Sequence, residues 1–123
     1  MTKHPVLVID DEAGLAWLVK LNLELTGEFQ VETANSGADG VKRAVENDFD
    51  LVITDYRMPG MDGRAVARAI KAAKPNCPVL LCTGDLELAS GQQPAEVAGV
   101  ISKPVDHKRL YAIITQTIAK SAV

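Results

Sequence analysis

The stretch Leu51-Val52-Ile53-Thr54-Asp55 joins an apolar run to a carboxylate near the middle of the chain. Three consecutive aliphatic residues, two of them β-branched, are typical of a strand that is buried on both faces. A turn rich in proline and glycine follows at residues 56–63. This pattern predicts a central strand with Asp55 at its carboxyl end. In open α/β sheets these ends border the ligand crevice, although Asp55 taken alone fits a turn cap equally well.

The composition is typical of one globular domain, with a core over residues 5–120. The chain has 123 residues, of which 47% are hydrophobic and 24% charged, with a net charge of −3. That charge gives no general attraction to nucleic acids or anionic membranes. The N-terminal segment lacks a signal-peptide core, and no apolar run approaches membrane-spanning length, so we expect a cytoplasmic protein. Cys77 and Cys82 have no metal-site spacing and are expected to be reduced thiols.

Apolar runs and helical spacings alternate along the whole chain. Strands are predicted at 6–9, 29–33, 51–55, 79–83 and 100–103, and helices at 13–26, 36–47, 64–74 and 106–120. A fifth, short helix is expected within 86–98, mainly after Pro94. Strand 29–33 alternates apolar and polar residues, which is typical of an edge strand. Five strands alternating with five helices predict an α/β fold with a doubly wound parallel sheet.

The first predicted helix carries many large apolar residues. Its spacing favours burial of Leu15, Leu18 and Leu25, which places Trp17 and Leu21 on a partly covered flank. The simplest role for Trp17 is packing along a neighbouring helix, and the alternative is a contact with another protein.

Polar residues follow four of the predicted strands. Because parallel strands end at the same edge of a sheet, Asp10, Asp11, Asp55, Thr83 and Lys103 are expected to converge there. Two like charges about 4 Å apart repel by roughly 4 kcal/mol at an effective dielectric constant of 20, so three ionised carboxylates need protons or a cation. Mg²⁺ suits such an oxygen-rich site. An N-cap role would explain one of the two neighbouring acids but not both.

Four segments resemble the motifs of a response-regulator receiver domain. They are V-L-V-I-D-D-E at 6–12, L-V-I-T-D-Y-R-M-P-G-M-D-G at 51–63, L-C-T-G at 81–84 and I-S-K-P at 101–104. The resemblance covers residues 5–120 and implies a three-layered, flavodoxin-like fold with strand order 2-1-3-4-5.

The resemblance also implies roles for individual residues. Asp55 would accept a phosphoryl group from a histidine kinase or phosphotransfer protein, Thr83 would bond a phosphoryl oxygen, and Lys103 would pair with it. Pro104 resembles the family's cis-proline, which would aim Lys103 at Asp55. The implied Mg²⁺ ligands are Asp10, Asp11, Asp55 and the backbone carbonyl of Arg57.

One position departs from the family pattern. Most receivers have an aromatic residue three positions before the strand-five lysine, and here it is Val100. Phosphoacceptor chemistry is therefore expected to be intact, whereas the usual signalling relay is not. His4 and His107 are expected to be surface residues.

The favoured function is a signalling switch or relay rather than an enzyme. The alternatives are a Mg²⁺-dependent phosphohydrolase with an aspartyl-phosphate intermediate and a flavin- or nucleotide-binding protein. The second is disfavoured because Asp10, Asp11 and Glu12 stand where a phosphate-binding loop would lie. A phosphodonor protein is expected to dock near Trp17, and the family pattern leaves room for a phosphorylation-dependent homodimer. The pattern fits both a free-standing regulator and part of a longer protein.

Overall fold

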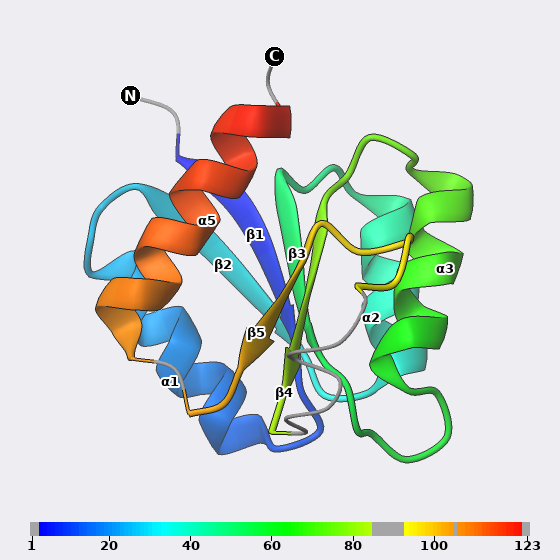
Figure 1. Ribbon diagram of the computed structural model, residues 1–123. Coiled ribbons are helices and arrows are strands. Elements are labelled where there is room, and N and C mark those ends of the chain that lie inside the picture. Colours follow the sequence, from blue (N-terminus) through cyan, green and yellow to red (C-terminus); the bar gives the residue numbers. More distant parts are fainter. Residues whose placement is uncertain (1–2, 85–92, 105, 122–123) are drawn as a thin grey trace.

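The computed structural model describes residues 3–84, 93–104 and 106–121. Five parallel strands form one sheet in the order β2-β1-β3-β4-β5 (Figure 1). The strands are β1 (His4–Ile9), β2 (Phe29–Ala34), β3 (Leu51–Asp55), β4 (Val79–Thr83) and β5 (Gly99–Ser102). The helices of the described residues are α1 (Ala13–Glu24), α2 (Gly37–Glu46), α3 (Gly63–Ala73) and α5 (His107–Ser121). The predicted fold class and strand order are confirmed.

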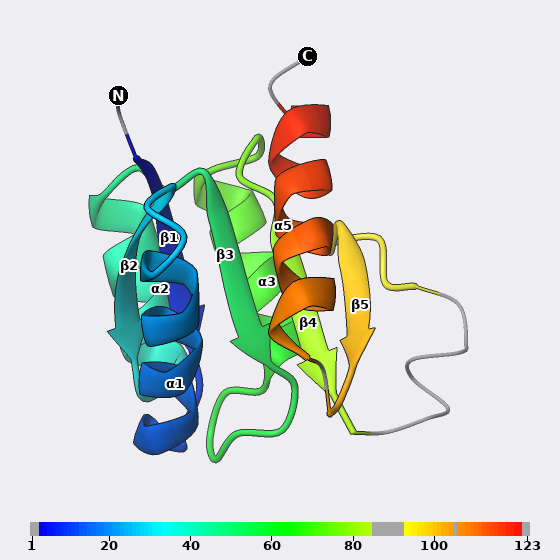
Figure 2. The same cartoon turned by 90° about the vertical axis from the view of Figure 1, so that its left-hand side faces the viewer.

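The sheet lies between two helical layers. Figures 1 and 2 show α1 and α5 on one face and α2 and α3 on the other. Each face has its own apolar cluster, and alternate residues of the central strands supply both. Val6 and Ile53 belong to the cluster beneath α1 and α5, and Leu7 and Val52 to the cluster beneath α2 and α3. The central strands are therefore buried on both faces, as their continuous apolar runs predict.

Three of the helices begin at residues whose side chains cap them. Ser36 accepts a hydrogen bond from the backbone N–H of Asp39, and Asp62 accepts one from Ala65. Asp106 accepts one from the backbone N–H of Arg109, 2.8 Å away, in the first turn of α5. These contacts satisfy backbone donors that the first helical turn leaves unpaired.

Two glycines allow helices to approach the central strands β3 and β1 closely. A Cβ atom at Gly63 would lie 2.4 Å from the carbonyl oxygen of Asp55, and one at Gly40 would lie 2.4 Å from Cδ1 of Ile9. The start of α3 therefore rests directly on the end of β3, and α2 rests on β1.

The buried face of α1 differs from the predicted one. Ala16 and Leu23 are buried, whereas Leu15, Leu18 and Leu25 are among the exposed large apolar side chains. The helix carries apolar residues around most of its circumference, so several faces satisfied the same spacing rule. The observed helix is therefore rotated about its axis relative to the prediction, and its exposed face is more apolar than expected.

The predicted short helix within 86–98 is not found in its described part. Residues 93–98 form a turn, in which the backbone N–H of Val97 donates to the carbonyl of Pro94 at 3.3 Å. Val97 packs into the core, and the N–H of Ala98 already bonds to Val79 of β4. The chain thus enters the sheet before another helical turn can form. The remainder of that prediction, residues 86–92, lies outside the described residues.

Within the described residues, no helix is long and apolar enough to cross a membrane. Both cysteines are free thiols, as predicted.

Candidate functional site

Three carboxylates meet where β1 and β3 end. β1 and β3 are neighbours, with Ile9 paired to Thr54, so the next residues, Asp10 and Asp55, leave the sheet side by side. Asp11 follows on the turn into α1, and ligand oxygens of the three acids all lie within 4.8 Å of one another. The predicted convergence of these acids at one sheet edge is therefore confirmed.

Asp10 is the most buried of the three acids. It is 8% exposed, and its Oδ1 accepts a hydrogen bond from the backbone N–H of Glu12 at 3.0 Å. Its burial raises the pKa of the carboxyl group, and the negative charges of Asp55 and Asp11 raise it further. The hydrogen bond from Glu12 and the charge of Lys103 oppose this rise without cancelling it. The folded protein therefore holds a proton on Asp10 more readily than an unburied aspartate would.

Lys103 supplies one positive charge at the cluster. Its Nζ lies 2.7 Å from Oδ1 of Asp55 and 4.0 Å from Oδ2 of Asp10. Burial alone would lower the pKa of Lys103, but the hydrogen bond to Asp55 and the charges of both acids outweigh it and raise that pKa. The Lys103–Pro104 peptide bond is cis. The structure thus brings Lys103 and Asp55 together, as the resemblance implied.

The two remaining predicted residues lie on adjacent segments. Thr83 ends β4, is buried, and accepts a 2.7 Å hydrogen bond at its carbonyl from the backbone N–H of Lys103. Arg57 lies in the turn after β3, is exposed, and places its guanidinium over the ring of Tyr56, 5.9 Å from the centroid. The functions of the Thr83 hydroxyl and the Arg57 carbonyl remain predictions.

The acids do not serve as side-chain caps of α1. The N-cap residue is Glu12, whose side chain makes no capping hydrogen bond, and the Asp10 carboxylate accepts from the N–H of Glu12 itself rather than from the first turn. The structural alternative for Asp10 and Asp11 therefore loses its support.

Asn35 contacts the site and was missed from the sequence. It follows β2, and its Nδ2 donates to the backbone carbonyl of Asp10 at 3.2 Å. A polar residue directly after a strand was the available signal, since β2 ends at the same sheet edge as β1.

A groove of about 290 Å³ opens beside the site, between α1 and the start of α5. Leu15, Leu18 and Leu110 line it together with Asp55 and Lys103. Cys82 lies in the same lining, where burial raises the pKa of its thiol to about 12. The groove therefore joins an apolar wall to the charged cluster and offers no thiolate at neutral pH.

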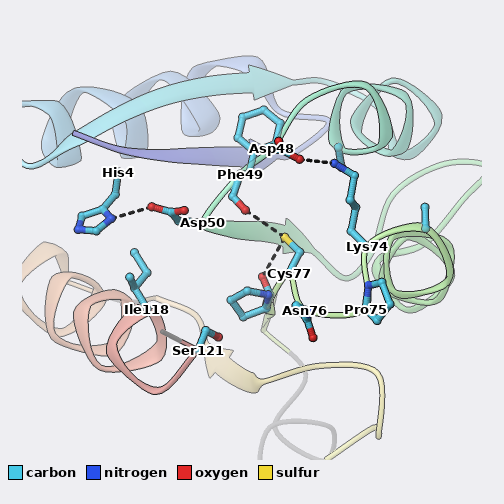
Figure 3. Close-up of a pocket in the computed structure, with 13 residues that line it drawn as sticks. His4, Asp48, Phe49, Asp50, Lys74, Pro75, Asn76, Cys77, Ile118 and Ser121 are labelled. Carbon is cyan, nitrogen blue, oxygen red and sulfur yellow. Dashed lines mark hydrogen bonds and ion pairs between the residues drawn. The ribbon is translucent and has the colours of Figure 1, made fainter. Parts of the chain in front are cut away.

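A second pocket, of about 400 Å³, lies at the opposite end of the sheet (Figure 3). Its charged side chains pair with one another: His4 Nδ1 lies 2.7 Å from Oδ2 of Asp50, and Lys74 Nζ lies 2.6 Å from Oδ1 of Asp48. His4 is exposed, as predicted. This pocket contains none of the predicted site residues.

The carboxylates at the first site suit a divalent cation. Oxygen ligands of this kind favour hard ions such as Mg²⁺, and a cation among three carboxylates whose ligand oxygens lie within 4.8 Å of one another would offset their mutual repulsion. The residues present therefore fit the metal that the sequence implied.

The strand order makes this chain a flavodoxin-like α/β domain. Within that class it belongs to the response regulator receiver domain family, whose sequence profile matches residues 6–115. It is a signalling domain homologous to the phosphoacceptor domains of two-component response regulators.

Curated relatives are longer regulators. Transcriptional regulatory protein GlrR of Escherichia coli K12 is 36% identical over 119 residues, which are 95% of this chain and 27% of that protein. DNA-binding transcriptional regulator NtrC of the same strain is 29% identical over 97% of this chain and 26% of its own length. The chain thus spans about a quarter of these relatives.

Solved structures match over almost the whole chain. A response regulator receiver domain protein from Clostridium thermocellum has a TM-score of 0.88 and 32% identity, with 97% of both chains covered. Response regulator protein TrrA from Thermotoga maritima, in complex with Mg²⁺-BeF, has a TM-score of 0.85 and 28% identity, covering 94% of this chain and 99% of that one.

Proposed function

We propose that Asp55 is the phosphoacceptor of this receiver domain and takes its phosphoryl group from a histidine kinase or histidine phosphotransfer protein. The proposal rests on the position of Asp55. Its carboxylate belongs to the three-carboxylate cluster, and its Oδ1 also lies 2.7 Å from Nζ of Lys103. A nucleophilic carboxylate, a cation site and a fixed ammonium group are the parts that phosphoryl transfer to an aspartate requires.

In the transfer step, a carboxylate oxygen of Asp55 attacks the phosphorus atom and a new P–O bond forms. The bond from phosphorus to the donor nitrogen breaks, and its electron pair stays on the donor imidazole. Lys103 already stands beside Asp55 and offsets the negative charge that arrives with the phosphoryl group. The hydroxyl of Thr83, at the end of the adjacent strand, is proposed to donate to a phosphoryl oxygen.

Asp10, Asp11 and Asp55 would hold Mg²⁺, with the backbone carbonyl of Arg57 as a further ligand. When bound, the ion supplies positive charge that stabilises the phosphoryl oxygens during transfer. TrrA, whose structure contains Mg²⁺-BeF, supports the choice of this cation.

The biological role follows from the family. We propose a cytoplasmic switch or relay without enzymatic activity toward other substrates, acting in a two-component pathway. GlrR and NtrC, transcriptional regulators by name, support a role in controlling transcription when the domain forms part of such a protein.

The phosphodonor is proposed to dock on α1. Trp17 is 58% exposed and Leu18 and Leu21 are also exposed, and the groove beside the site is walled by residues of the same helix. A donor that enters this groove to reach Asp55 would contact α1, and tryptophan is enriched among the residues that anchor interfaces.

Mass spectrometry after incubation with acetyl phosphate and Mg²⁺ tests the acceptor. We expect one phosphoryl adduct, located on Asp55 and lost with a chelator or in Asp55→Asn. Asp50→Asn is a matched control, because Asp50 precedes the same strand at its other end. An adduct that persists in Asp55→Asn would refute the assignment.

The hydrolase alternative predicts a different result. A phosphohydrolase would turn over many phosphate esters at high rate, whereas a switch releases one phosphate for each phosphorylated domain. We expect no multiple turnover with phosphomonoesters.

A further inference from the structure

Among the hydrogen bonds of the described residues, one side chain links the end of β2 to the acidic turn, the turn after β1 that carries Asp10 and Asp11. That side chain is Asn35. Its Nδ2 donates to the backbone carbonyl of Asp10 at 3.2 Å, and the backbone N–H of Asp10 donates to Ala34 at 3.0 Å. The edge strand therefore holds Asp10 from both sides of its backbone.

The carbonyl that Asn35 contacts belongs to the peptide plane that joins Asp10 to Asp11. Because a peptide unit is planar, fixing this carbonyl also fixes the direction of the Asp11 amide. The carboxylate of Asp10 has a separate restraint, the hydrogen bond from Glu12. Asp11 is exposed, so the peptide plane matters more for its placement than for that of buried Asp10.

We propose that Asn35 is a positioning residue of the metal site, which acts by orienting Asp11 toward the cation. This inference rests on the proposed function, because it presupposes that Asp10, Asp11 and Asp55 hold Mg²⁺. Asn35 itself binds neither the ion nor the phosphoryl group.

Outer-shell contacts of this kind change metal affinity more than they change stability. Loss of a hydrogen bond that orients a ligand typically lowers metal affinity by about tenfold or more. Asn35 is exposed and its hydrogen bond to the Asp10 carbonyl is only partly buried, so water can take the place of its amide at that carbonyl. Asn35→Ala is therefore expected to raise the Kd for Mg²⁺ by about tenfold, with little change in the urea midpoint of the metal-free domain.

Asn47→Ala is the matched control. The Nδ2 of Asn47 also donates to a backbone carbonyl, that of Arg43, at 3.0 Å, and Asn47 is likewise exposed, at the end of α2. Mg²⁺ titrations followed by amide NMR shifts should leave the Kd of this variant at the wild-type value. In the metal-free domain, the ¹⁵N relaxation of the Asp11 amide should show increased motion in Asn35→Ala but not in Asn47→Ala.

A double-mutant cycle tests the route through Asp11. If Asn35 acts by orienting Asp11, then Asn35→Ala should change the Kd little when Asp11→Asn is already present. An undiminished tenfold effect in that background would overturn the proposed route. Phosphorylation by acetyl phosphate at saturating Mg²⁺ should return close to the wild-type rate in Asn35→Ala, since only metal loading is impaired.

The results separate this inference from the proposed function. If the wild-type domain fails to bind Mg²⁺ or to form the Asp55 adduct, the proposed function is wrong. If the wild-type domain does both, and Asn35→Ala has the wild-type Kd and the same Asp11 mobility, the inference alone is wrong. A large fall in the urea midpoint of Asn35→Ala would show a structural role and overturn it as well.

Discussion

Lys103 Nζ lies 2.7 Å from Oδ1 of Asp55 and only 4.0 Å from Oδ2 of Asp10, so one ammonium group serves two carboxylates. Lys103 stands just after β5, Asp10 just after β1, and Asp55 is the last residue of β3, and the three positions meet because all five strands are parallel. A cation bound at the same acids would share their charge with Lys103.

Replacing Lys103 should separate metal binding from phosphoryl transfer. Lys103→Gln removes a positive charge from the cluster, so Mg²⁺ should bind at least as tightly as in the wild type. Phosphorylation by acetyl phosphate should nevertheless slow by at least tenfold, because the charge that stabilises the phosphoryl group is gone. Rates at saturating Mg²⁺ test this, with Lys74→Gln, in the opposite pocket, as the control. Unchanged rates would show that Lys103 does not contribute to phosphoryl transfer.

The raised pKa of Asp10 predicts how stability depends on pH without metal. The folded state binds the proton of the Asp10 carboxyl group more tightly than the unfolded state does. The domain therefore loses stability as the pH rises from the ordinary aspartate pKa through the raised pKa of Asp10. Asp10→Asn lacks that cost. Urea unfolding in the absence of Mg²⁺ should therefore show the variant to be more stable than the wild type at pH 7, with a smaller advantage at pH 3.5. A variant less stable at pH 7 would contradict this electrostatic account.

The sequence allowed prediction of those parts of the site that depend on strand order and direction. Asp10, Asp55 and Lys103 each lie at the carboxyl end of a strand with a continuous or short apolar run, and parallel strands bring such ends together whatever lies between them. The caps at Ser36 and Asp106 were similarly visible, because capping depends on residues three apart.

Other features depend on contacts that no local pattern contains. The rotation of α1 was mispredicted because leucines occupy several of its faces, and only packing against the sheet selects Ala16 and Leu23. Asn35 was missed because its partner is a backbone carbonyl, which every residue has. The turn at 93–98 forms because Ala98 pairs with Val79, a contact between distant segments.

Gly63 should be essential for the geometry of the acceptor. A Cβ there would lie 2.4 Å from the carbonyl oxygen of Asp55 and 2.6 Å from Cδ1 of Leu81, so α3 or β3 must move. Gly63→Ala is expected to cost about 1–3 kcal/mol of unfolding free energy, the usual range for overpacking. Gly14→Ala is the control, because nothing lies within 4 Å of its Cβ position in α1 and alanine favours helices. Urea denaturation of both variants measures the difference, and equal stabilities would show that the backbone adapts freely.

Trp17 allows the proposed docking surface to be tested separately from the chemistry. Its side chain is 58% exposed in the first half of α1, close in sequence to the acidic turn, so its loss should affect the partner rather than the fold. Trp17→Ala should slow phosphotransfer from the cognate donor protein by at least tenfold, as expected for an interface anchor, and leave phosphorylation by acetyl phosphate unchanged. Leu25→Ala is the matched control, because Leu25 is 75% exposed at the far end of the same helix. Rapid-quench measurements with both donors decide the matter. If Trp17→Ala slows phosphorylation equally with both donors, or lowers stability markedly, Trp17 has a structural role. If Leu25→Ala slows phosphotransfer from the donor protein as much as Trp17→Ala does, the apolar surface of α1 binds the donor without a specific anchor.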